Sequence, residues 1–178
     1  MEQLTHGEGG PSGDVDPSWS PDGAALVFAS QSADQRDRLA LQVVDIRTRR
    51  ISKLPGSQGL WSPRWSPDRR YIAALGFPQH KIWLYNVETH AQTELTTIAA
   101  GWPSWSPDSR YIYFEDNATS FWYRVRIADR HTERLASLSN LKMPVSGLGW
   151  IGLTLDASLI STRDAGSTEI YALDWEIP

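Results

Sequence analysis

Hydrophobic residues along this chain fall in short runs of about five, bounded by polar turn residues, and lack the three-to-four-residue spacing of amphipathic helices. The clearest runs are rich in β-branched and aromatic residues: Ala24–Ser30, Leu39–Asp45, Tyr71–Gly76, Lys81–Asn86, Tyr111–Glu115 and Phe121–Ile127. Runs of this length and composition between turns are typical of β-strands. The pattern therefore predicts an all-β protein without a helix of any length.

The strands recur with a period. The letters WSPD appear at 19–22, 65–68 and 105–108, and Trp150 follows in the sequence GWIG. After each WSPD come two of the strand-like runs, a polar turn, and a short run that holds a single leucine: Leu54, Leu95 or Leu135. Counting the strand that contains the tryptophan, each unit has four strands. Self-similarity at a fixed period indicates a repeat architecture.

The quartet itself has a local explanation in turn chemistry. Serine hydrogen-bonds the backbone, proline fixes φ, and Asp22, Asp68 and Asp108 follow. Gly23 supplies a left-handed residue after the first quartet, whereas Arg69 and Ser109 either adopt that conformation at a cost or use a different turn. The tryptophans Trp19, Trp65, Trp105 and Trp150 are assigned to the repeat. Those that begin the three WSPD quartets, just before the turn, are predicted to be buried between neighbouring sheets.

The last unit lacks its fourth strand. Leu148–Trp150, Leu159–Thr162 and Glu169–Trp175 are its expected first three strands, and Asp156 replaces the missing turn after an insertion. At the other end of the chain, Leu4 matches the leucine of the fourth strands. We therefore expect the N-terminal strand to complete the last sheet, so that the units span 14–56, 60–98, 101–138, and 146–178 together with 1–7.

The pattern P-x-W-S-P-D at 17–22, 63–68 and 103–108 resembles the TolB-like, or WD40-like (PD40), β-propeller repeat. The resemblance covers essentially the whole chain and implies a β-propeller of four four-stranded blades in a bacterial protein. Because propellers typically carry about four to eight blades, three alternatives stay open: a compact four-bladed ring, a homodimer that forms a larger ring, or a piece of a longer propeller.

Composition excludes several classes of protein. The net charge is −4 without a basic run, so a nucleic-acid partner is not expected. No stretch is apolar enough for a membrane helix, and MEQLTHGEGG does not look like a signal peptide. The absence of cysteine removes disulfides and thiolate sites and leaves the compartment, cytoplasmic or periplasmic, open.

Motifs that would carry chemistry are weak. GLGWIG at 147–152 fits a dinucleotide fingerprint, but a strand-like run follows it where a helix is required. The carboxylates of Asp14 and Asp16 do not belong to a calcium loop, and the four histidines form no metal pair. No cofactor and no metal site are therefore predicted, and no catalytic residue is visible.

In a propeller, the innermost strands line a central channel, and the loops entering them form one face. The residues expected at this channel mouth are Asp14, Asp16, Gln58, Trp61, Arg64, Trp102 and Ser146. Aromatic, carboxylate and guanidinium groups suit a protein or peptide, with a small molecule or sugar as the alternative ligand. A second interpretation is that Trp61 and Trp102 only fill gaps between blades.

The leading hypothesis is therefore a non-catalytic interaction module. The resemblance implies the same, because TolB-like propellers are protein-binding partners in the bacterial envelope, often in the periplasm. The alternatives are a hydrolase or lyase-type propeller enzyme of small molecules, and the accessory or gating propeller of a peptidase or sensor protein. The first requires convergent carboxylates, histidines or a metal, and the second requires a separate catalytic domain.

Deletion of residues 1–6 tests the expected ring closure. Without this strand the last sheet would present an open edge, so we expect a lower thermal unfolding midpoint or aggregation. Thermal unfolding followed by circular dichroism measures the effect, and an unchanged midpoint would contradict the arrangement.

Overall fold

The computed structural model describes residues 3–5, 13–31, 39–140, 150–162 and 166, and all regular elements within these ranges are β-strands. The all-β prediction is confirmed. The first sheet contains β1 (Asp14–Trp19), β2 (Ala25–Gln31), β3 (Leu39–Asp45) and β4 (Ile51–Lys53). The second contains β5 (Leu60–Trp65), β6 (Tyr71–Gly76), β7 (Lys81–Asn86) and β8 (Gln92–Glu94).

The third sheet contains β9 (Ala100–Trp105), β10 (Tyr111–Asp116), β11 (Phe121–Arg126) and β12 (Thr132–Ser137). A terminal sheet of two strands, β13 (Ile151–Leu153) and β14 (Leu159–Ser161), follows. All strand pairs are antiparallel and join neighbours in sequence, so each sheet is a simple meander. The further strands expected for the last unit, at 169–175 and in most of 1–7, lie outside the described residues.

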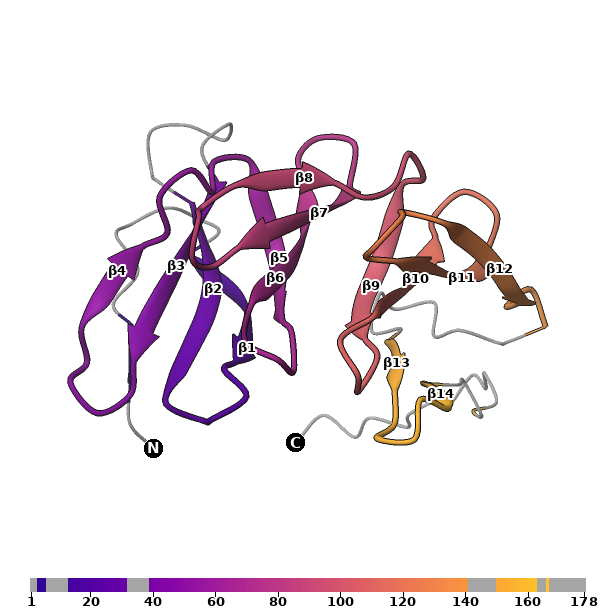
Figure 1. The fold of residues 1–178 in the computed structure, drawn as a ribbon. Helices are drawn as coiled ribbons and strands as arrows, with labels where there is room; N and C mark the ends of the chain where they lie inside the picture. Colours follow the sequence, from indigo (N-terminus) through magenta and orange to yellow (C-terminus); the bar gives the residue numbers. More distant parts are fainter. Residues whose placement is uncertain (1–2, 6–12, 32–38, 141–149, 163–165, 167–178) are drawn as a thin grey trace, which may run out of the picture.

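The four sheets are arranged as an arc in which the first strand of each sheet lies innermost (Figure 1). Residues of β1, β5, β9 and β13 line one shared cavity, which confirms that these strands converge. Each sheet therefore extends outward from a common centre, and the second and third sheets each lie between a preceding and a following sheet.

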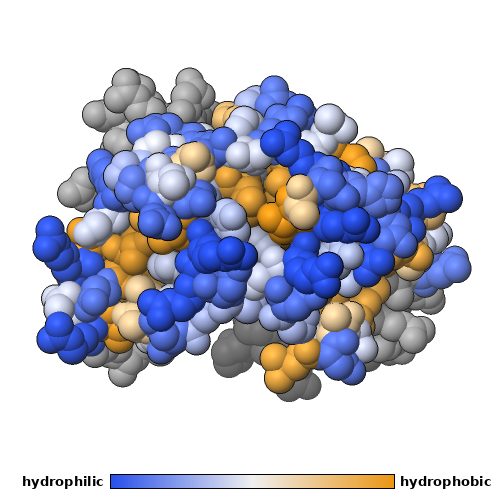
Figure 2. All heavy atoms as spheres, viewed as in Figure 1, coloured by the Kyte–Doolittle hydropathy of each residue, from blue (hydrophilic) through white to orange (hydrophobic). Residues whose placement is uncertain are grey.

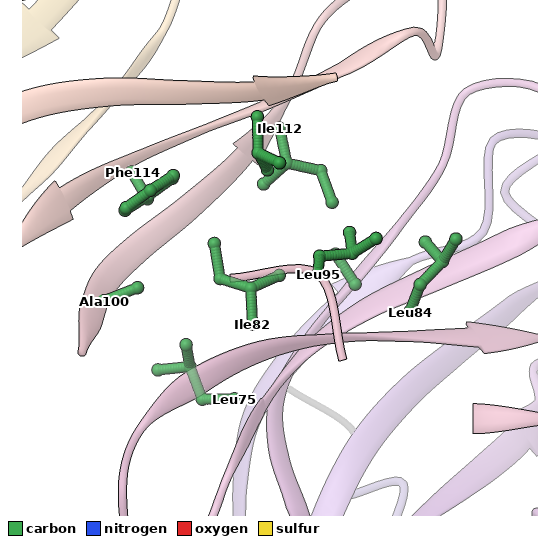
Figure 3. Packing of buried hydrophobic residues seen from close by; sticks show 9 residues of the cluster. Leu75, Ile82, Leu84, Leu95, Ala100, Ile112 and Phe114 are labelled. Carbon is green, nitrogen blue, oxygen red and sulfur yellow. The ribbon is translucent and has the colours of Figure 1, made fainter. Parts of the chain in front are cut away.

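One row of side chains across each sheet makes the contact with the preceding sheet. In the second sheet this leading row is Trp65, Ile72, Tyr85 and Gln92, and in the third it is Trp105, Ile112, Val125 and Thr132. The central pair of each row is completely buried. The third sheet packs on the second through a cluster that includes Leu75, Ile82, Leu95, Ile112 and Phe114 (Figure 3).

Polar bonds reinforce this packing near the axis. The Nε1–H of Trp105 donates to the carbonyl of Arg64 in the preceding sheet at 2.8 Å. The hydroxyl of Ser18 accepts the backbone N–H of Trp65 at 3.2 Å, which links the first and second sheets. Trp65 and Trp105 each therefore form a joint between two sheets, as the sequence predicts, although both rings are only half-buried.

The prediction of burial is wrong for Trp19, whose side chain is 57% exposed. Its row in the first sheet is Trp19, Leu26, Val44 and Ile51. This row has the register of the buried rows in the second and third sheets. Trp19 is exposed because no sheet of the described residues packs against this face of the first sheet.

The WSPD turn forms as predicted, and its geometry is the same in all three copies. The serine hydroxyl donates to the aspartate that follows, at 2.7, 2.7 and 2.6 Å for Ser20, Ser66 and Ser106. The same hydroxyl accepts the backbone N–H five residues later at 2.9 Å in every copy. The serine is buried, and its hydroxyl both donates and accepts a hydrogen bond within the turn, so the turn is stabilised by its own residues.

The residue after each aspartate is left-handed, whatever its type. Gly23, Arg69 and Ser109 have φ values of 70°, 68° and 59°. The second and third copies therefore accept the left-handed cost, about 1 kcal/mol for a residue with a Cβ atom, and do not change turn type. Ser109 adds a bond from this position, because its hydroxyl accepts the N–H of Asp68 in the neighbouring sheet at 3.0 Å.

The terminal sheet differs from the expectation. Thr154 donates its hydroxyl to Asp156 and accepts the N–H of Ser158, and Ala157 is left-handed with φ 64°. These residues reproduce the serine–aspartate turn, which confirms the substitution by Asp156. Leu153 rather than Trp150 therefore occupies the position before the turn, and the assignment of Trp150 to that position is wrong by three residues.

Leu4 occupies the place expected of a fourth-strand leucine. It lines a cavity of about 300 Å³ together with Leu26, Phe28 and Val44 of the first sheet. Leu95 packs in the same way on Ile112, Phe114 and Val125, the equivalent positions of the third sheet. Residues 3–5 are not in a strand, and their expected pairing with 169–175 lies outside the described residues.

Substitution of Trp105 measures the strength of the joint between sheets. We expect Trp105→Ala to lower the free energy of unfolding by about 3 kcal/mol, because a large ring that packs on the second sheet is lost. Trp105→Phe keeps most of the packing but lacks the Nε1–H donor, so a loss of about 1 kcal/mol is expected. Urea unfolding of the three proteins provides the comparison, and a Trp105→Phe protein as stable as the parent would contradict the hydrogen bond.

The turn carboxylates make stability depend on pH. The serine hydroxyl, with a backbone N–H, lowers the pKa of Asp22 and of Asp108 below the ordinary value of 3.8. A carboxyl whose pKa is lower in the folded state stabilises the fold above its unfolded pKa, and this contribution is lost as the pH falls through the folded pKa. We therefore expect the unfolding midpoint to fall as the pH drops below about 4.

Ser106→Ala tests the cause, because it removes the hydroxyl that lowers the pKa of Asp108. Its unfolding midpoint should depend less steeply on pH below 4 than that of the parent protein. Ser104→Ala, two residues earlier on β9, is the matched control and should keep the parent slope. A steeper dependence in Ser106→Ala would refute the assignment.

Candidate functional site

The innermost strands carry a repeated irregularity that shapes the centre of the molecule. Asp16, Ser62 and Trp102 each lie three residues before the tryptophan of their unit and have φ values of 54°, 51° and 52°. Each precedes a proline, and the strand register shifts at this point in β1, β5 and β9. A bulge of this kind bends the strand and re-aims the side chains around it.

The bulges lie beside a central cavity of about 510 Å³. Four tryptophans line it: Trp65 from β5, Trp102 and Trp105 from β9, and Trp150 immediately before β13. Ile151, Leu153 and Leu155 of the terminal sheet and its turn add further apolar surface. The cavity is open to solvent, since the side chains of Trp102 and Trp150 are 36% and 43% exposed.

Arg64 is the only ionisable residue among the described residues that line this cavity. Its guanidinium lies 2.9 Å from the carboxylate of Asp16, an ion pair between the second and first sheets. It also donates to the carbonyl of Pro63 at 2.8 Å. These two contacts hold the charge at the wall of the cavity, which Ser18 and Ser104 also line.

The structure brings together three of the seven predicted site residues. Arg64 and Trp102 line the cavity, and Asp16 pairs with Arg64. Asp14 lines the separate cavity over the first sheet that also holds Leu4. Gln58 is exposed in the turn before β5, and Ser146 lies outside the described residues.

Trp61 packs between sheets, as the second interpretation of this residue predicts. Its ring packs against the hydrophobic clusters on both faces of the second sheet and makes an edge contact with His80 at 5.3 Å between ring centroids. It does not line the cavity. The gap-filling interpretation is therefore correct for Trp61, whereas Trp102 faces the cavity.

Sequence reasoning assigned Trp65, Trp105 and Trp150 to the repeat alone and missed that they also line the cavity. The available signal was their position on or beside the innermost strand of each unit, next to Ser18, Arg64 and Ser104. A residue can join two sheets and still expose one edge of its ring to the channel.

In the rest of the described chain, titratable groups are not gathered into a site. Burial, with the neighbouring charge of Asp116, raises the pKa of Glu115, but this residue pairs with Trp122 on the third sheet, away from the cavity lining. Among the described residues, no group of three or more His, Cys, Asp or Glu side chains is placed to hold a metal ion. The described part of the chain also has no helix long and apolar enough to span a membrane.

Comparison with known proteins identifies the fold. Neither a family model nor a curated protein matches the sequence. Among solved structures, TolB from Acinetobacter baumannii superposes with a TM-score of 0.65 at 18% identity, over 86% of this chain and 39% of that one. An oligogalacturonate lyase in complex with manganese matches with a TM-score of 0.61 at 17% identity, over 85% of this chain and 46% of that one.

Dipeptidyl peptidase 4 from Porphyromonas gingivalis matches with a TM-score of 0.53 at 16% identity, over 85% of this chain and 29% of that one. The chain spans less than half the length of each of these three structures. At such identities the likeness shows the fold alone. The predicted TolB-like β-propeller fold is therefore confirmed.

Proposed function

We propose that this protein is a non-catalytic interaction module that binds an extended peptide segment of a protein partner in the tryptophan-lined central cavity. The observation that carries the proposal is the composition of this cavity. Four indole rings and one guanidinium surround about 510 Å³ of open space. Tryptophan and arginine are the residues that dominate the energetics of protein recognition.

The chemistry of the wall indicates what such a peptide would contain. Trp65, Trp102 and Trp150 offer flat apolar surfaces that suit proline, leucine or aromatic side chains. Arg64 offers N–H donors to a carboxylate or a backbone carbonyl, in exchange for part of its interaction with Asp16. An apolar segment with one acidic residue or a free C-terminus combines both features. The structural likeness to TolB supports a protein-binding role.

The enzyme alternatives are supported by the likeness to the lyase and to the peptidase. Hydrolysis or lyase chemistry in the cavity would require a general base or acid near the reacting atoms. The described lining offers Arg64 as its ionisable group and no histidine, aspartate or glutamate. The interaction module is therefore the function that this cavity supports best.

Selection from a displayed library of linear peptides tests the proposal. Selected peptides should quench or shift the tryptophan fluorescence on binding, since the rings line the cavity. We expect Trp102→Ala and Arg64→Ala each to weaken binding at least about tenfold, as the loss of a central contact does. Phe77→Ala removes a comparably exposed aromatic ring outside the cavity, 46% against 36%, and should bind normally.

Two results would overturn the proposal. Peptides that bind the parent, Trp102→Ala and Arg64→Ala proteins equally well would place recognition elsewhere. Turnover of peptide or oligosaccharide substrates by the 178-residue chain, lost in Arg64→Ala, would favour the enzyme alternative.

A further inference from the structure

We call the face of a sheet that carries its leading row the leading face. The leading face of the first sheet has the side chains of a contact surface between sheets, but no described sheet lies against it. Its row of Trp19, Leu26, Val44 and Ile51 has the register of the rows that are buried in the second and third sheets. Trp19 and Ile51, at the two ends of the row, are 57% and 40% exposed, and Val44 in its middle is buried. Leu26 is partly exposed, whereas its equivalents Ile72 and Ile112 are completely buried. Apolar atoms reach the surface over this sheet, on the left of Figure 2.

At the opposite end of the arc, the terminal sheet exposes the kind of face that the next sheet covers elsewhere in the molecule. The position that follows the leading row on the second strand faces the next sheet, and Val27 and Ala73 are completely buried there. Its equivalent in the terminal sheet is Ile160, which is 45% exposed. Ile160 therefore belongs to a face that a following sheet would cover.

Most of the exposed large hydrophobic residues gather at these two ends. Of the nine in the described part of the chain, Trp19 and Ile51 belong to the leading face, and Trp150, Leu155, Leu159 and Ile160 belong to the terminal sheet and its turn. The two ends have the register to pack together as consecutive sheets do. In the described part of the chain both groups are exposed at the same time, so β13 and β14 do not cover Trp19 and Ile51 of their own first sheet.

We propose that the leading face of the first sheet receives the terminal sheet of a second copy of this chain, in a head-to-tail contact. Ile160 of the second copy then takes the place that Ala73 takes against Ile112 within one chain. Leu4 already covers the middle of the leading face, as Leu95 covers the third sheet. Two such contacts, related by a twofold axis, close a ring from two arcs.

The mass of the 178-residue chain in solution tests the contact. Light scattering should give twice the 20.0 kDa of one chain. Ile51→Glu should convert this species to single chains without loss of the far-ultraviolet circular dichroism spectrum. Leu135→Glu is the matched control, because Leu135 has nearly the same exposure, 39%, on the outermost strand of the third sheet, and this variant should keep the double mass.

A cross-link identifies the occupant directly. The chain has no cysteine, so Trp19→Cys and Ile160→Cys place the only thiols. On mild oxidation, a disulfide-linked dimer on a denaturing gel is the expected product. A cross-link within one chain would overturn the proposal in favour of closure by the protein's own last sheet. A single-chain mass at all concentrations, with accessible Trp19, would also overturn it.

Discussion

Packing of one sheet's leading row onto the sheet before it is the interaction on which the rest of this molecule depends. A four-stranded sheet of this size has two faces and cannot bury both by itself, so each repeat unit is stable only between neighbours. In the second and third sheets the tryptophan on the innermost strand adds to this contact, because its ring packs on the cluster between the sheets. The Nε1–H of Trp105 anchors that ring on the carbonyl of Arg64. The cavity is what remains at the centre when four innermost strands converge under this constraint.

Much of the fold could be predicted from the sequence because the signals are local. The predicted run Leu39–Asp45 and the observed β3 are identical, as are Lys81–Asn86 and β7. Serine, proline and aspartate define the turn through bonds within six residues, so the same four letters give the same geometry three times. Local chemistry of this kind needs no knowledge of the rest of the chain.

The site was less predictable because it depends on where the register shifts. Trp61 and Trp102 both stand close before a proline on an innermost strand, but one lies four residues before its repeat tryptophan and the other three. The strand alternation and the bulge place Trp61 among the hydrophobic clusters between sheets and Trp102 at the cavity. The type of the left-handed residue in that bulge carries no signal, since aspartate, serine and tryptophan all occupy it, and only the proline that follows marks the position. The position of Leu153 before the terminal turn was not predicted for the same reason, because the inserted residues shift the strand so that Leu153 takes the place of the tryptophan.

The bulge position also has a consequence for how such a module changes its specificity. Asp16, Ser62 and Trp102 share one backbone conformation although their side chains have nothing in common. The conformation is therefore imposed by the strand and the proline that follows, and three unrelated side chains are compatible with it. At Trp102, the one of the three that lines the cavity, a single substitution would replace the indole by a charge or a hydroxyl on the same strand backbone. Diversification of ligand preference and preservation of the scaffold are thus uncoupled in this architecture.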